Sequence, residues 1–200
     1  MFDWKDLSIN ARIALCLVLA EKMIPKIEAM IGNYEIGEMY AKGKRQIYDI
    51  LSLAWRLLED IRHTDWMEMY LISTIDGEWV DDENDNRYGY FDFILELNCE
   101  NDEEARIVSN MMIFCFYYPM YRFAERQNKA LPQDLEWFGM EESEAKAFLV
   151  IDNAVNLYLP KDEQEKISTL KNNLLNLFPY NKAEPYGKYF TQQTITGLLA

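Results

Sequence analysis

Apolar residues recur at three- and four-residue spacing from residue 9 to residue 31, which is typical of a helix with one buried face. The positions on this face are Ile9, Ile13, Cys16, Leu17, Ala20, Ile24, Ile27 and Ile31. Pro25 lies inside the stretch and has no N–H, so we expect it to kink the helix or to divide it near Met23. We expect Gly32 to end it.

The clearest periodicity in the chain follows, over about residues 36–62. Its apolar stripe is formed by Ile47, Ile50, Leu51, Ala54, Leu57, Leu58 and Ile61. The opposite side carries Arg56, Glu59 and Asp60, so the pattern predicts a second amphipathic helix. A shorter segment, residues 65–75, is consistent with a third helix.

The helix expected next has a clear start and an apolar middle. Asn101 is followed three residues later by Glu104, which predicts an N-cap at Asn101. Residues 111–118 are apolar on all sides, which indicates a helix at the centre of the fold. Pro119 should bend or stop this helix, although residues 121–127 could continue it.

Two further helices are expected, and a tail follows them. A helix over about residues 142–158 ends before Pro160, and another over about 161–178 ends before Pro179. The periodicity then fades, and residues 179–200 could dock on the bundle, form an extended edge or stay mobile. The sequence thus predicts one all-α domain of about seven helices over residues 1–178, followed by a C-terminal tail.

Charge adds one feature that the hydrophobic pattern does not show. The 200 residues carry a net charge of −14, and half of them are apolar, which is ample for a core. Residues 76–104 hold twelve carboxylates and one arginine, Arg87, and therefore −11 of that charge. Such a chain repels nucleic acid and anionic membranes, so a charged partner would be basic.

We expect a cytoplasmic protein that does not span a membrane. The longest apolar runs have eight residues, against about 20 needed to cross a bilayer. The N-terminus also lacks the basic start of a secretory signal. The three cysteines, Cys16, Cys99 and Cys115, are scattered among apolar residues, which favours reduced core thiols over disulfides.

Few residues suggest catalysis or cofactor binding. The single histidine, His63, follows a helix end, where a favourable interaction with the helix dipole explains it better than catalysis does. No glycine pattern matches a phosphate-binding loop, and no second histidine or cysteine pair is present to hold zinc. The sequence therefore predicts no catalytic residues, no cofactor and no metal.

Residues 76–104, which we call the acidic segment, allow several interpretations. Asp81, Glu83 and Asp85 alternate as in a calcium loop and Asp92 is twelfth, but the sixth position is Asn86 and the twelfth is not Glu. Paired carboxylates could serve acid–base chemistry, or the charge could belong to a solvated loop. Because aromatic residues are interleaved with the acids, a protein-binding patch is equally consistent with the composition.

Three segments together resemble a group of small all-helical bacterial proteins. They are Leu15–Pro25, Ile50–Leu58 and Asp81–Tyr90, and the likeness extends over about residues 10–100. The group comprises an uncharacterised branch and a branch of immunity proteins of polymorphic toxin systems. This chain departs from the group at Arg56, where an acid is usual, and it has more Asp residues before Tyr88-Gly89-Tyr90.

The resemblance implies a cytoplasmic antidote that binds a toxin domain, often a nuclease with a basic cleft, and blocks it. The residues expected to contact the toxin lie in the acidic segment: Trp79, Asp81, Asp82, Glu83, Asp85, Tyr88, Tyr90 and Asp92. Two alternatives stay open. One is an interaction module or dimerising scaffold of another bacterial system, and the other is an enzyme that uses carboxylates with a divalent ion.

Overall fold

In a computed structural model, residues 3–31, 37–60, 102–131 and 136–199 are described, with the backbone alone at 31 and 37–46. These ranges contain six α-helices, two single 3-10 turns and no strand, which confirms the all-α prediction. The predicted helix over residues 65–75 lies outside them. The α-helices are α1 (Ile9–Ile31), α2 (Gly37–Glu59), α5 (Glu103–Gln127), α7 (Glu141–Tyr158), α8 (Lys161–Leu177) and α9 (Gln192–Leu199), and the 3-10 turns are η1 (Trp4–Asp6) and η2 (Trp137–Gly139).

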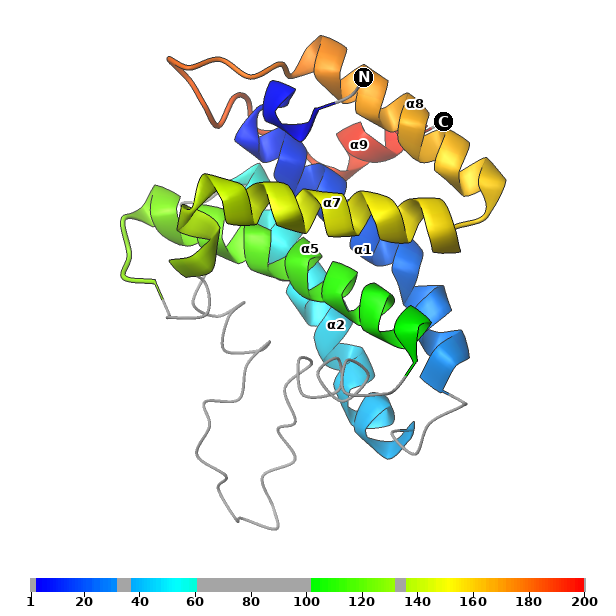
Figure 1. Ribbon diagram of the computed structural model, residues 1–200. Coiled ribbons are helices and arrows are strands. Elements are labelled where there is room, and N and C mark those ends of the chain that lie inside the picture. The colour runs from blue at the N-terminus through cyan, green and yellow to red at the C-terminus, as the bar shows by residue number, and fades with distance from the viewer. Residues whose placement is uncertain (1–2, 32–36, 61–101, 132–135, 200) are drawn as a thin grey trace.

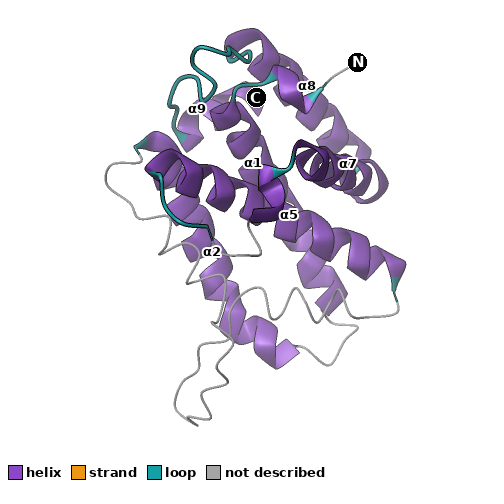
Figure 2. Cartoon of the chain, turned by 60° about the vertical axis from the view of Figure 1, so that its left-hand side comes forward, coloured by secondary structure: helices purple, strands orange, loops and turns teal. Residues whose placement is uncertain are grey.

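Helix α5 is the centre of the packing, as its all-round apolar middle predicts. It packs against α1, α7 and α2, and α1 also packs against α2. Met111, Cys115 and Phe116 have no exposed surface. Figure 1 shows α7 crossing α1 and α5, and Figure 2 shows α8 and α9 together at one end of the molecule with α2 at the other.

Neither internal proline ends or divides its helix. Helix α1 continues through Pro25 to Ile31, and α5 continues through Pro119 to Gln127. A proline inside a helix costs about 3 kcal/mol, because one hydrogen bond is lost and the ring crowds the preceding turn. Buried residues on both sides of each proline, such as Met23 and Ile27 in α1, offset this cost through tertiary packing.

The N-cap of α5 is Asp102, and not Asn101 as the sequence pattern predicts. The Asp102 carboxylate accepts hydrogen bonds from the backbone N–H groups of Glu104, at 2.8 Å, and Ala105, at 3.4 Å. Asn and Asp are about equally good N-caps, so two adjacent candidates leave the start of the helix ambiguous by one residue.

The tail after α8 docks on the first turn of α1. The backbone N–H groups of Ser8 and Ile9 donate to the carbonyls of Phe178 and Pro185, both at 2.9 Å, and Asn10 N–H donates to Tyr186 at 3.2 Å. These N–H groups have no partner within a helix, and no acidic residue lies in the first turn of α1. Ser8 Oγ accepts the N–H of Ala11 at 3.4 Å, and the tail completes the N-terminal cap of α1 from a distant part of the sequence (Figure 1).

The chain ends in a two-turn helix that the periodicity does not predict. Helix α9 packs against α8, and Ile195 is buried. Just before α9, the ring of Phe190 lies 4.7 Å from that of Phe178, measured between ring centres. A helix of eight residues is marginal by itself, so it forms here because α8 covers its apolar side.

Cys16 and Cys115 are buried free thiols, as predicted, while Cys99 lies outside the described residues. Burial among apolar side chains raises the pKa of the Cys16 thiol well above its usual range. Within the described ranges, no helix combines the length and the apolar character needed to cross a membrane.

Gly187 tests the docking of the tail. Its φ is +68°, and an added Cβ would lie 2.7 Å from the Cβ of Ser8. We predict that Gly187→Ala lowers the free energy of unfolding by about 1–3 kcal/mol or more, because strain in the left-handed region adds to the clash. Urea denaturation measures this change.

Gly197→Ala is the matched control, because an added Cβ at Gly197 meets no atom within 4 Å. This substitution should leave stability unchanged or raise it by up to about 1 kcal/mol, since Ala favours a helix. Equal stability of the Gly187→Ala variant and the wild type would show that the tail does not pack closely on Ser8 in solution.

Candidate functional site

The toxin-contact residues predicted from the sequence all lie outside the described residues. This holds for Trp79, Asp81, Asp82, Glu83, Asp85, Tyr88, Tyr90 and Asp92, as well as for His63. The calcium-loop register shares several of these positions and falls in the same interval. Their roles stay predictions, and the described helices supply a different candidate site.

A groove of about 580 Å³ lies between α1 and α2, and Gln192 of α9 also lines it. Its floor is apolar, because Ile24, Leu51 and Trp55 are buried there. We call it the α1–α2 groove. Its lining consists of Glu21, Ile24, Pro25, Glu28, Tyr48, Leu51, Ser52, Trp55, Arg56, Glu59 and Gln192.

The helical repeat explains why these residues share one surface. On α1, Glu21, Pro25 and Glu28 are spaced by four and three residues, so they form a row beside the buried stripe. On α2, Tyr48 and Glu59 stand three turns apart on the corresponding face. Two facing rows thus enclose the groove.

Glu21 is the most constrained polar side chain in the groove. One of its oxygens, Oε1, accepts the indole N–H of Trp55 at 2.8 Å and the amide N–H of Gln192 at 3.0 Å. Burial raises the pKa of the Glu21 carboxyl, and these two hydrogen bonds, together with the charge of Lys22, oppose the shift only in part. The carboxylate is therefore held in a fixed position by neutral donors.

Because of Pro25, the backbone carbonyl of Glu21 is a second available acceptor on this residue. A proline at this position cannot donate to the carbonyl four residues earlier, which is that of Glu21. The backbone carbonyl of Glu21 thus lacks its regular helical partner on the turn that lines the groove.

The lining of the groove is acidic on balance. Glu21, Glu28 and Glu59 face it, against the single cation Arg56. Among the ion pairs formed by the described residues, none involves Glu21, Glu59 or Arg56. Acidic side chains around a partly aromatic surface can recognise a cationic group.

The sequence holds a partial signal for this groove. Glu21 and Trp55 belong to two of the segments on which the family resemblance rests, Leu15–Pro25 and Ile50–Leu58, and the structure joins them through a hydrogen bond. No sequence pattern indicates that these segments meet. Gln192 carries no signal at all, because α9 is not predicted.

A second polar cluster is buried between helices and lies around Glu144 of α7. Its Oε1 accepts from Arg12 of α1 at 2.7 Å, and its Oε2 accepts from Arg122 of α5 at 2.5 Å. Arg12 also donates to the backbone carbonyls of Leu7 and Lys5, each at 3.0 Å. One carboxylate thus links three helices and the N-terminal turn.

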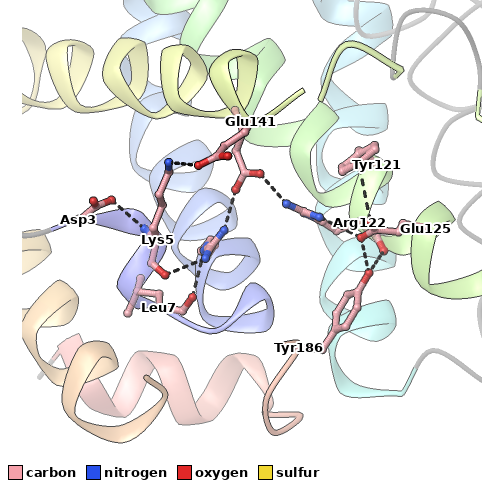
Figure 3. A network of polar contacts seen from close by, with 10 residues as sticks. Asp3, Lys5, Leu7, Tyr121, Arg122, Glu125, Glu141 and Tyr186 are labelled. Atoms are coloured by element: carbon pink, nitrogen blue, oxygen red, sulfur yellow. Dashed lines mark hydrogen bonds and ion pairs between the residues drawn. The ribbon is translucent and has the colours of Figure 1, made fainter. Parts of the chain in front are cut away.

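The cluster extends to the tail, as Figure 3 shows. Arg122 also pairs with Glu125 at 2.9 Å, and Glu125 accepts the hydroxyl of Tyr186 at 2.7 Å. Two guanidinium groups and two carboxylates balance, so the network is electrically closed. We therefore assign it a structural role and not a catalytic one.

No group of three or more potential metal ligands occurs in the part of the chain that the structure describes. Comparisons with known proteins add no further assignment. No protein-family model matches the chain, and neither the curated proteins nor the solved structures contain a match. The resemblance to immunity proteins therefore stays a prediction.

The closed network gives a prediction for Glu144. Replacing it with alanine leaves Arg12 and Arg122 buried without a shared counter-ion, so we expect the free energy of unfolding to fall by about 3–5 kcal/mol. Glu142→Ala on the same helix is the control, because this exposed side chain pairs only with Lys146, at 3.3 Å, and its loss costs about 0.5 kcal/mol or less. Thermal and urea unfolding of both variants would decide, and equal losses would contradict a structural role for Glu144.

Proposed function

We propose that this protein is an immunity protein, which binds a cognate bacterial toxin domain and neutralises it. The observation that carries the proposal is the concentration of twelve carboxylates and one arginine in residues 76–104, interleaved with aromatic residues. The family resemblance supplies the biological role. The acidic lining of the α1–α2 groove adds support from the described helices.

The partner expected from this charge is basic. Acidic residues raise the association rate with a basic surface, and aromatic side chains provide most of the binding energy once the surfaces meet. A nuclease domain has a basic cleft because it must hold phosphates, so an acidic, aromatic segment can occupy that cleft in place of nucleic acid. The proposed contact set is the one predicted from the sequence, Trp79 to Asp92.

The connectivity is suited to this role. The acidic segment, residues 76–104, comes after α2, which ends at Glu59, and its last residues form the N-cap and the start of the first turn of α5, which begins at Glu103. Both helices pack in the core, so the segment is attached to the folded body at each end. Attachment at both ends lowers the entropy that is lost on binding relative to a free tail.

The first test is a pull-down from the native host with the tagged chain at low and at high salt. The proposal expects one basic protein to be retained at low salt and to be weakened at high salt. That protein must arrest growth when it is expressed alone, and co-expression of this chain must restore growth. Recovery of nothing but copies of this chain would contradict the proposal.

The acidic segment is tested by replacing Asp81, Asp82 and Asp85 with Asn and Glu83 with Gln. We predict at least a tenfold loss of affinity for the captured protein, with a shallower dependence on salt, because steering charges are removed. The control changes four exposed acids to amides, at Glu142, Asp162, Glu165 and Glu184. Equal affinity of the two variants would show that the contact set is wrong.

A further inference from the structure

We propose that the α1–α2 groove is a binding site for an arginine side chain of the protein partner, with the Glu21 carboxylate as its counter-ion. The inference rests on the proposed function for the nature of the partner, but the groove itself is argued from the described helices alone. None of its lining residues belongs to the predicted contact set.

The Glu21 carboxylate has acceptor capacity that the described residues do not use. Both of its hydrogen bonds end on Oε1, and Oε2 accepts none from the described residues. A carboxylate offers about four acceptor positions, so at least half of its capacity stays available. The groove thus presents a partly buried negative charge that two neutral groups orient, and of the nearby cations Lys22 acts on it through its charge without an ion pair.

The two lysines of α1 nearest to Glu21 pair with carboxylates of other helices. Lys22, next to Glu21 in sequence, pairs with Glu163 of α8 at 2.8 Å. Lys26, one turn further along α1, pairs with Glu104 of α5. Arg56 also lines the groove, but no ion pair joins it to Glu21 or to any other described residue. Glu21 therefore forms no ion pair with the described residues, and three carboxylates against one guanidinium leave the lining with a net negative charge that favours an incoming cation.

The size and the lining of the groove suit a guanidinium group. The volume of about 580 Å³ lies within the range of roughly 300–1,000 Å³ that is usual for ligand sites. Tyr48, which is 49% exposed, provides aromatic surface in the groove, while the buried Trp55 forms part of its floor. A guanidinium is planar, weakly hydrated and able to stack on aromatic rings while it donates to a carboxylate, so arginine fits better than lysine.

The groove can be tested without any toxin, with Nα-acetyl-arginine methylamide as the probe. The neutral isostere Nα-acetyl-citrulline methylamide is the matched ligand control, with sodium chloride added to equalise ionic strength. The readout is the indole N–H resonance of Trp55, assigned among the five tryptophans with a Trp55→Phe variant. Because the probe is small, we expect saturable binding only in the roughly millimolar range.

Glu21→Gln is the decisive variant. Its amide oxygen can still accept from Trp55 and Gln192, while the charge is lost. We expect the affinity for the arginine probe to fall about tenfold or more, which corresponds to one charge-assisted hydrogen bond. Glu165→Gln, an exposed position on α8, removes the same charge and should leave the affinity unchanged.

Folding and pH provide internal checks. Since burial raises the pKa of the Glu21 carboxyl, its charged form destabilises the folded state at neutral pH, so Glu21→Gln should be at least as stable as the wild type. For the same reason, probe binding should weaken as the pH falls through the raised pKa of Glu21, whereas the Glu21→Gln variant should show no such step.

The two proposals fail in different ways. If the citrulline probe binds as well as the arginine probe, or if Glu21→Gln binds the arginine probe as tightly as the wild type, the groove is not a guanidinium site, whatever the pull-down returns. If the arginine probe binds as expected but no growth-arresting protein is captured, the groove is supported as a guanidinium site and the immunity function is contradicted. With a captured partner, Glu21→Gln must also weaken the complex, and an unchanged affinity would overturn the assignment of the groove to that partner.

Discussion

The arrangement of the helices depends on the buried carboxylate of Glu144. It pairs with Arg12 of α1 at 2.7 Å and with Arg122 of α5 at 2.5 Å. A shift of α7 along the other two helices would therefore leave a buried charge without its counter-ion. Hydrophobic packing is tolerant of small shifts, whereas a buried ion network is not. Arg12 transmits the constraint to the N-terminal turn, and Glu125 transmits it to the tail through Tyr186.

Glu144 and Glu21 show how one type of side chain acquires two roles. Glu144 has two guanidinium partners, and its charge is satisfied within the fold. Glu21 is also partly buried, but its partners are an indole and an amide, and the lysines that follow it in α1 are paired with α8 and α5. A closed network stabilises the structure, while an oriented carboxylate that forms no ion pair with the described residues is suited to recognising a cation.

Local patterns predicted most of the helices, because amphipathic periodicity identifies the buried face of a helix without information on which other helix covers it. The errors occur where tertiary packing outweighs a local preference. Pro25 and Pro119 are tolerated because the turns on both sides are buried, and α9 forms because α8 covers it. Ser8, whose Oγ accepts the N–H of Ala11, is a local N-cap of α1, but the acceptors of Ser8, Ile9 and Asn10 N–H could not be predicted, because they are carbonyls of Phe178, Pro185 and Tyr186, far along the chain.

The sequence by itself determined the all-helical class, the apolar character of the central helix and the concentration of acidic charge in residues 76–104, because each is a property of neighbouring residues. Only the tertiary structure decided which charges are neutralised and which stay available. That distinction depends on pairs such as Arg12 with Glu144, and Glu21 with Trp55 and Gln192. No pattern of neighbouring residues encodes these pairs, since they form only when distant helices pack together.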